Sequence, residues 1–119
     1  MSTLITYRVA GSLALIGLAR APVNALGQPL REAIVQACLR AAADPAVQAL
    51  VVHGASGLFC AGADISEFGS PASFAAPDLP TVLERLTHID KPIIAAVGKL
   101  ALGGGLELAL GMHFRIADT

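Results

Sequence analysis

Residues 102–110 read Leu-Gly-Gly-Gly-Leu-Glu-Leu-Ala-Leu, with three consecutive glycines ahead of an apolar run. Glycine has no Cβ, so a ligand or a second backbone can approach the chain closely at this point. The apolar run predicts a short helix over residues 106–110, and the segment before the glycines predicts a strand over 93–97. A second stretch, Phe59-Cys60-Ala61-Gly62-Ala63-Asp64-Ile65, has the same order. It follows a predicted strand over 47–53 and a glycine-rich loop, and leads into a short predicted helix over 64–68.

Both stretches offer free backbone N–H groups where a helix begins, because first-turn amides have no intrahelical partner. If the fold brings the two stretches together, one developing oxyanion could sit between two N–H donors. The alternative is that the glycines serve tight turns or close packing of a helix against a strand. A phosphate loop of the Walker type is excluded, because the Lys and Ser/Thr that follow its glycines are missing.

Glu107 lies among apolar residues in the first turn of the helix predicted over 106–110. A carboxylate buried in such a place is a candidate general acid or base. The alternative is that Glu107 only complements the positive N-terminal end of the helix dipole. The other reactive side chains give weaker evidence for a catalytic or metal-binding site. The three histidines lack metal-ligand spacing, Cys38 falls on an apolar helix face, and Cys60 has no histidine partner at a recognisable spacing.

The rest of the chain alternates strands with helices. Two antiparallel strands are predicted over residues 4–9 and 13–18, and a final strand over 113–117. One helix is predicted over 29–43, ending before Asp44-Pro45, and a second over 79–89. The expected core face of the first helix consists of Leu30, Ile34, Ala37, Cys38 and Ala41. This order predicts an α/β fold with mostly parallel strands, in one domain.

Composition excludes several classes of function. The 119 residues are 55% apolar and 14% charged, which excludes a disordered chain. The formal net charge is -1 and there is no basic run, so neither nucleic acid nor an anionic membrane is the expected partner. No stretch is a convincing membrane span or targeting segment. Two cysteines are too few for a disulfide framework and favour a reducing compartment.

Taken together, these stretches resemble the enoyl-CoA hydratase/isomerase family, the crotonases. The matching segments follow the family's order along almost the whole chain: Ala21-Pro22-Val23-Asn24-Ala25, Phe59 to Ile65, Lys91 to Val97, and Gly103 to Ala109. Residues 100–117 are most similar to the hydratase domain that opens the multifunctional fatty-acid oxidation enzymes. The resemblance implies a crotonase-like (ClpP/crotonase) β-β-α spiral fold. Residues 1–119 would form the N-terminal part of one such domain, incomplete at its C-terminus.

The resemblance also implies roles for individual residues. The backbone N–H groups of Ala61 and Gly104 would form the oxyanion hole for a thioester carbonyl, and Glu107 matches the first of the family's two catalytic glutamates. The path of the coenzyme A (CoA) moiety would be lined by Ala61, Gly62, Ala63, Asp64, Ile65, Ala21 and Val23. The implied reaction adds water across the 2,3 double bond of a trans-2-enoyl-CoA in β-oxidation. It needs no metal, and no cofactor beyond the CoA carried by the substrate.

Two alternatives stay open: another acyl-CoA reaction of the family (double-bond isomerisation, hydrolysis or decarboxylation), or a non-catalytic acyl-CoA-binding module. Glu107 favours the hydratase. The family's second glutamate lies beyond the strand that ends near Ala117, so we expect the full-length protein to be active and the 119-residue chain alone to be inactive. Expected partners are an acyl-CoA, copies of the protein in a trimer or a dimer of trimers, or a fused dehydrogenase domain. The expected compartment is the bacterial cytoplasm, or the mitochondrion or peroxisome of a eukaryote.

Overall fold

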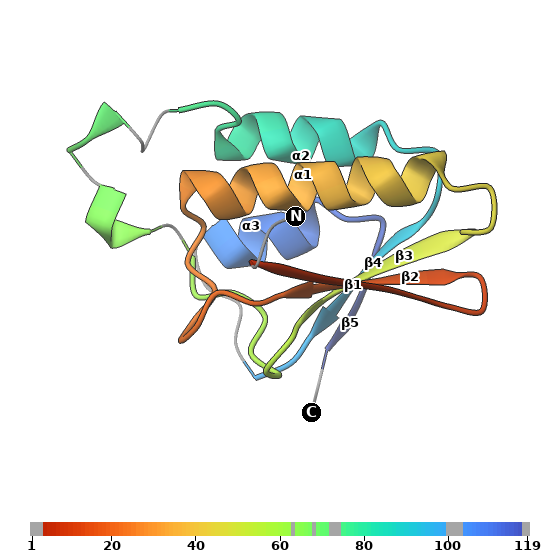
Figure 1. The fold of residues 1–119 in the computed structure, drawn as a ribbon. Coiled ribbons are helices and arrows are strands. Elements are labelled where there is room, and N and C mark those ends of the chain that lie inside the picture. The colour runs from red at the N-terminus through yellow and green to blue at the C-terminus, as the bar shows by residue number, and fades with distance from the viewer. Residues whose placement is uncertain (1–3, 63, 68, 72–74, 100–103, 118–119) are drawn as a thin grey trace.

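The computed structural model, which describes residues 4–62, 64–67, 69–71, 75–99 and 104–117, has one sheet beneath a layer of helices (Figure 1). The strands are β1 (Ile5–Ala10), β2 (Leu13–Leu18), β3 (Ala49–Gly54), β4 (Ile93–Val97) and β5 (Phe114–Ala117). The helices are α1 (Gln28–Ala43), α2 (Leu79–Thr87), α3 (Gly104–Leu110) and the 3₁₀ helix η1 (Ile65–Glu67).

The strands lie side by side in the order of the sequence, β1-β2-β3-β4-β5. β1 and β2 form an antiparallel hairpin in which Ile5 pairs with Leu18 and Ala10 with Leu13. The other three pairs are parallel, and each is connected through a helix. Since every parallel connection advances one strand in the same direction, α1, α2 and α3 lie on one face of the sheet (Figure 1). This arrangement confirms the α/β class with mostly parallel strands.

The core lies between that face and the helices. Its largest members, all fully buried or nearly so, are Phe59, Ile16, Leu18, Leu26, Leu30, Ile34, Leu50, Leu86, Ile93, Leu108, Val47 and Val52. The predicted inner face of α1, from Leu30 to Ala41, is buried as expected. The opposite face of the sheet is open: Phe114 and Ile116 on β5 are 60% and 65% exposed. Alternation along β2, β3 and β4 therefore gives one face to the helices and leaves apolar side chains on the other, whereas all four residues of β5 are exposed.

Residues distant in sequence fix both ends of α1. The N-cap is Gly27, and the first helical amide, that of Gln28, donates to Glu67 Oε2 at 2.9 Å. At the other end Lys91 Nζ donates to Ala41 O at 3.0 Å and to the Asp44 carbonyl at 2.6 Å. A carboxylate near the N-terminus and an ammonium group at the C-terminus both suit the helix dipole.

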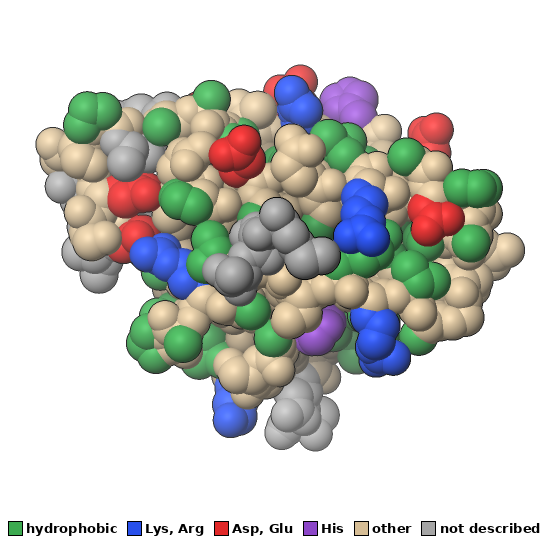
Figure 2. Space-filling model, in the orientation of Figure 1, with side chains coloured by type: hydrophobic (Ala, Val, Ile, Leu, Met, Phe, Trp, Pro, Cys, Tyr) green, Lys and Arg blue, Asp and Glu red, His purple; other side chains and the backbone are tan. Residues whose placement is uncertain are grey.

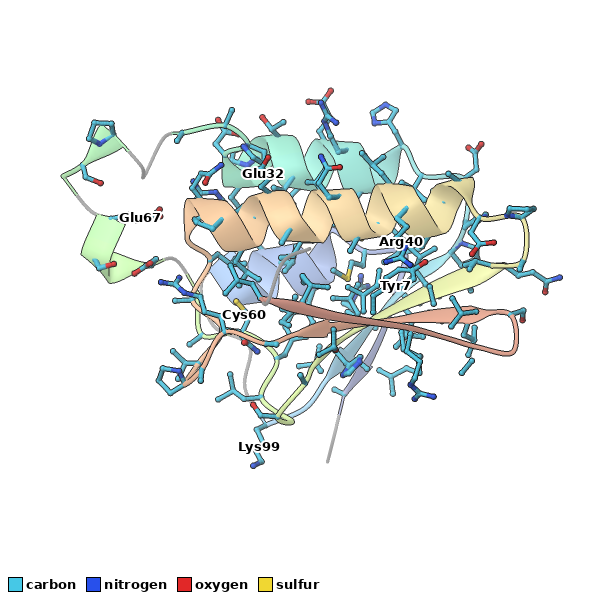
Figure 3. The ribbon with its side chains drawn as sticks, in the orientation of Figure 1. Tyr7, Glu32, Arg40, Cys60, Glu67 and Lys99 are labelled. Carbon is cyan, nitrogen blue, oxygen red and sulfur yellow. The ribbon has the colours of Figure 1, made fainter. Side chains whose placement is uncertain are left out.

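The charged side chains are few, and on the face drawn in Figure 2 those of both signs are scattered among apolar ones. One of them packs on an aromatic ring: the Arg40 guanidinium lies 4.0 Å from the centroid of the Tyr7 ring (Figure 3). This cation–π contact joins α1 to β1, which lies at one edge of the sheet.

Several predicted boundaries shift for local reasons. α2 ends at Thr87, because His88 takes the C-cap position; the inward-facing Ile89 is nevertheless buried. β3 begins at Ala49, since Val47 closes a turn by donating to Asp44 O. The helix expected over 64–68 is a single 3₁₀ turn, Ile65–Glu67. α3 begins at Gly104, two residues before the predicted start.

Candidate active site

The two glycine-containing segments meet at the carboxyl ends of β3 and β4. A Cβ atom on Gly105 would overlap the backbone of Cys60, so the first turn of α3 rests directly on the loop after β3. In Figure 3 the Cys60 side chain lies in this region, beside α3. Gly98, just after β4, approaches the carbonyl of Gly57 just as closely. Ala63 and residues 100–103 lie outside the described part of the chain.

The loop after β2 forms the third side of this region. The Ala61 N–H donates to Val23 O at 2.9 Å, and the Leu26 N–H donates to Gly62 O at 2.8 Å. Val23 and Ala61, both predicted to line the CoA path, are therefore neighbours. The Ala61 amide, which the sequence predicts to be an oxyanion donor, therefore has a backbone acceptor in this structure. Local sequence could not show this, since the acceptor lies 38 residues earlier.

Cys60 is fully buried, and its thiol donates to Asn24 O at 3.0 Å. Burial raises the pKa of the Cys60 thiol, and a hydrogen bond from the Gly62 N–H acts in the opposite direction. Cys38, on the inner face of α1, is likewise buried, which raises its pKa to about 12. Both thiols are thus protonated at neutral pH, which suits structural cysteines rather than nucleophiles.

Asp64 uses its carboxylate to hold the loop. Its Oδ2 lies 2.7 Å from Arg20 Nη2, and its Oδ1 accepts from the Ser66 hydroxyl at 2.6 Å and the Ser66 amide at 3.0 Å. The hydrogen bond from the Ser66 hydroxyl, followed by that from Arg20, holds the pKa of Asp64 below its ordinary value. Gly27 leaves room for this pair, because a Cβ there would lie 2.8 Å from Arg20 Nη1. Sequence reasoning missed Arg20, for which no local pattern gives a signal.

Arg31 is a buried cation that sequence reasoning also missed, and it is 5% exposed. Its guanidinium donates to Leu26 O at 2.8 Å and to Pro77 O at 2.8 Å, and it pairs with Glu67 at 3.2 Å. Glu67 projects from η1 toward α1 (Figure 3). Arg31 therefore connects the first turn of α1 to Glu67 of η1 and to Pro77, which precedes α2.

Glu107 lies in the first turn of α3, as predicted, but its side chain is exposed. The burial considered from its apolar neighbours is wrong for a reason of helical geometry. Among the positions of this segment whose burial is described, the buried ones are Gly105, Leu108, Ala109 and Met112. Glu107 is two residues from Gly105, which is about 200° around the helix, so it points away from the core.

The histidines do not converge. His53 lies on β3 and His88 caps α2, whereas His113 Nδ1 accepts from the Ile93 N–H at 2.9 Å and so extends the pairing of β4. Within the described ranges no three His, Cys, Asp or Glu side chains form a group that could hold a metal ion. None of the helices described there is long and apolar enough to cross a bilayer.

A mostly parallel sheet with helices on one face, and two strand-to-helix glycine segments in contact, defines the crotonase-like class of α/β proteins. Comparison with known proteins agrees: residues 8–119 match the family model described as Enoyl-CoA hydratase/isomerase. The chain belongs to this family. A solved structure of Pseudomonas aeruginosa DspI superposes with a TM-score of 0.89 at 31% identity, covering 98% of this chain and 50% of that one.

Two curated relatives come from different kingdoms. The zebrafish (Danio rerio) protein named "Peroxisomal bifunctional enzyme" is 48% identical over 106 residues, which are 89% of this chain and 14% of that protein. The Bacillus subtilis protein named "Probable enoyl-CoA hydratase" is 37% identical over 118 residues, covering 95% of this chain and 46% of that protein. The chain thus spans less than half the length of either relative.

Proposed function

We propose that the full-length protein is an enoyl-CoA hydratase, which adds water across the 2,3 double bond of a trans-2-enoyl-CoA in fatty-acid β-oxidation. The observation that carries the proposal is the contact of Gly105 with the Cys60 backbone. It joins the two segments through which the family resemblance assigns the oxyanion hole. Membership of the hydratase/isomerase family and the presence of Glu107 in the first turn of α3 support the same reaction.

In this proposal the thioester oxygen binds between an amide of the loop after β3 and the Gly104 amide. Negative charge develops on that oxygen when water adds to the double bond, and preorganised N–H donors stabilise it there. The Ala61 amide can serve as the first donor only by giving up its bond to Val23 O. The other candidate donor is the amide of residue 63, further along the same loop.

Replacing single amides by esters separates these two donors. An α-hydroxy acid incorporated at position 61 or at position 63 removes one N–H and keeps the side chain. Loss of a true oxyanion donor lowers kcat by roughly 10²- to 10³-fold. If the ester at position 61 lowers only stability, its amide serves the fold and position 63 supplies the donor.

Glu107 is the proposed catalytic carboxylate, which positions and activates the water. Its exposed side chain projects from α3 away from the core, where a substrate can reach it. Ala21, Val23, Gly62, Asp64 and Ile65 belong to the loops proposed to carry the CoA moiety. For Asp64 the proposed contribution is indirect, because its oxygens are bound to Arg20 and Ser66.

The proposed cofactor requirement, assembly and compartment follow from the same reaction. The substrate brings its own CoA, and water addition requires no other cofactor. The proposed assembly is a homo-oligomer, a trimer or a dimer of trimers, or a chain with a fused dehydrogenase domain that would oxidise the 3-hydroxyacyl product. The proposed location is a compartment of fatty-acid β-oxidation: the bacterial cytoplasm, or the mitochondrion or peroxisome of a eukaryote.

The direct test is hydration of crotonyl-CoA by the purified full-length protein, followed by the loss of the conjugated thioester absorbance and by identification of 3-hydroxybutyryl-CoA. Formation of the hydroxy product supports the proposal. Three outcomes contradict it in favour of the alternatives. Interconversion of 3-enoyl- and 2-enoyl-CoA indicates an isomerase, and release of free CoA indicates a hydrolase. Binding of acyl-CoA without turnover indicates a binding module.

A further inference from the structure

Asn24 is buried, with 3% of its surface exposed, and it connects two loops of the candidate site. Its side-chain Nδ2 donates to Leu58 O at 3.0 Å and to Phe59 O at 2.9 Å, and its Oδ1 accepts from the Arg20 amide at 2.8 Å. Its main-chain carbonyl accepts from the Cys60 thiol at 3.0 Å. Every polar group of the Asn24 side chain is therefore used, and three consecutive residues of the loop after β3 are bound to this one residue.

The next contacts along the loop continue from the same point. The Ala61 amide bonds to Val23, the residue before Asn24, and the Gly62 carbonyl accepts from the Leu26 amide. The Cys60 carbonyl lies against Gly105 of α3. The carbonyls of Leu58, Phe59 and Gly62 and the amide of Ala61 thus each have a hydrogen-bond partner. Because a peptide group is rigid and planar, these partners fix the orientation of the backbone between residues 58 and 62.

The backbone of Asn24 suits this task. Its φ of 54° lies in the left-handed region, which Asn tolerates better than other residues with a side chain, apart from Asp. Its side chain carries both an NH₂ group and a carbonyl oxygen, so it can donate to two carbonyls and accept from one amide. Asp has the same shape but no donor, Gly has the same backbone freedom but no side chain, and Ala has neither advantage.

We propose that Asn24 is a positioning residue for the oxyanion hole, which holds the loop after β3 in the arrangement that its donor amide needs to reach the thioester oxygen. The proposal rests on the hydratase function proposed above. Asn24 acts on the reaction through the carbonyls of Leu58 and Phe59 and through the thiol of Cys60. A displacement of about 1 Å in a catalytic group can cost roughly 10²-fold in rate. Loss of Asn24 should therefore lower kcat much more than it changes KM.

The experiment compares Asn24→Asp, Asn24→Gly and Val35→Ala in the full-length protein. Asn24→Asp keeps the shape of the side chain and places an acceptor against two carbonyls. Asn24→Gly keeps the backbone conformation and removes the three side-chain hydrogen bonds. Val35→Ala is the stability control, because Val35 is buried in α1 and its apolar side chain takes no part in the hydrogen bonds that hold the loop after β3. For both Asn24 variants we expect kcat to fall by about 10- to 100-fold and KM to change by less than about threefold. Val35→Ala should lower Tm and leave kcat unchanged.

A second readout does not depend on turnover. Acetoacetyl-CoA forms an enolate whose oxygen needs the same donors, and the bound enolate has its own ultraviolet absorption. We expect the wild-type protein to enrich this enolate and the Asn24 variants to lose most of the enrichment, measured well below each variant's Tm. Asn24 variants with a normal enolate band and normal kcat overturn the positioning role, even if their Tm is low. A wild-type protein that neither hydrates crotonyl-CoA nor enriches the enolate overturns the proposed function itself, and the Asn24 proposal with it.

Discussion

Gly105 lies so close to Cys60 that the Cys60 carbonyl occupies the space a Cβ atom on Gly105 would need. One residue belongs to α3 and the other to the loop after β3, so this contact sets the distance between the two halves of the proposed oxyanion hole. The obstacle on the Cys60 side is backbone, which cannot rotate out of the way as a side chain can.

Gly105→Ala should therefore push α3 away from the loop. We expect kcat for crotonyl-CoA hydration in the full-length protein to fall by at least about 10-fold, and the free energy of unfolding to fall by about 1–3 kcal/mol. Steady-state kinetics and urea unfolding measure the two effects.

Gly111→Ala is the matched control, because a Cβ there meets Leu83 Cδ2, the end of a flexible side chain, at 2.7 Å. Leu83 can move, so this variant should keep kcat within about threefold of wild type. Equal losses of activity in the two variants would contradict a special role for the Cys60 contact.

The Asp64 carboxylate should make stability depend on pH. Its pKa is lowered in the folded protein, first by the Ser66 hydroxyl and then by Arg20. A group of this kind contributes stability above its unfolded pKa, about 3.9, and the contribution is lost as the pH falls through the lower folded value. Asp64→Asn should therefore be less stable than wild type at pH 7, and the difference should shrink as the pH falls below about 4.

Urea unfolding at a series of pH values measures this difference. Ser66→Ala, which removes the larger cause of the lowered pKa, should weaken the pH dependence while leaving the pair with Arg20 in place. An Asp64→Asn variant whose stability deficit is the same at pH 3 and pH 7 would show that the carboxylate charge is not involved.

Arg31 should contribute more stability than its partner Glu67. Arg31→Met leaves the buried carbonyl of Leu26 and that of Pro77 without the donors they have in the native protein, at a cost of about 3 kcal/mol in the free energy of unfolding. Glu67→Gln keeps an oxygen that can accept from the Gln28 amide, but it removes the counter-charge of the buried Arg31 and should cost about 2 kcal/mol. Chemical denaturation of both variants tests the order, and a larger loss for Glu67→Gln would reverse this account.

Most of the fold could be predicted because the pattern of neighbouring residues determines each strand and helix. Alternation and β-branched residues mark the strands, and small residues between a predicted strand and a predicted helix mark the two segments that meet at the site. Pro29 and the Asp44-Pro45 step mark the ends of α1 within two residues. Boundaries shifted by one or two residues, as at the end of α2, where His88 forms the C-cap.

The contacts that hold the site could not be predicted, because each joins residues far apart in sequence. Asn24 bonds to carbonyls 34 and 35 residues away, and Arg31 pairs with a carboxylate 36 residues away. Local sequence gives an Asn or an Arg but not its partner. For the same reason it could not show that the Ala61 amide is bound to Val23, or that Glu107 lies on the exposed side of α3.

The last prediction concerns Glu107 in the full-length protein. Glu107→Gln keeps the shape of the side chain and removes the carboxylate that is proposed to activate water. General acid–base groups contribute about 10²- to 10⁴-fold, so kcat should fall within that range while KM changes little. A carboxylate that only complements the helix dipole is worth less than about 1 kcal/mol, so its loss would lower Tm slightly and leave kcat nearly intact. Glu84→Gln, which changes another exposed carboxylate on α2, is the control and should leave both kcat and KM unchanged. Steady-state hydration kinetics and a thermal melt on the same preparations separate the two roles. An unchanged kcat in Glu107→Gln would assign this carboxylate to the stability of α3 and leave the oxyanion hole as the chain's contribution to catalysis.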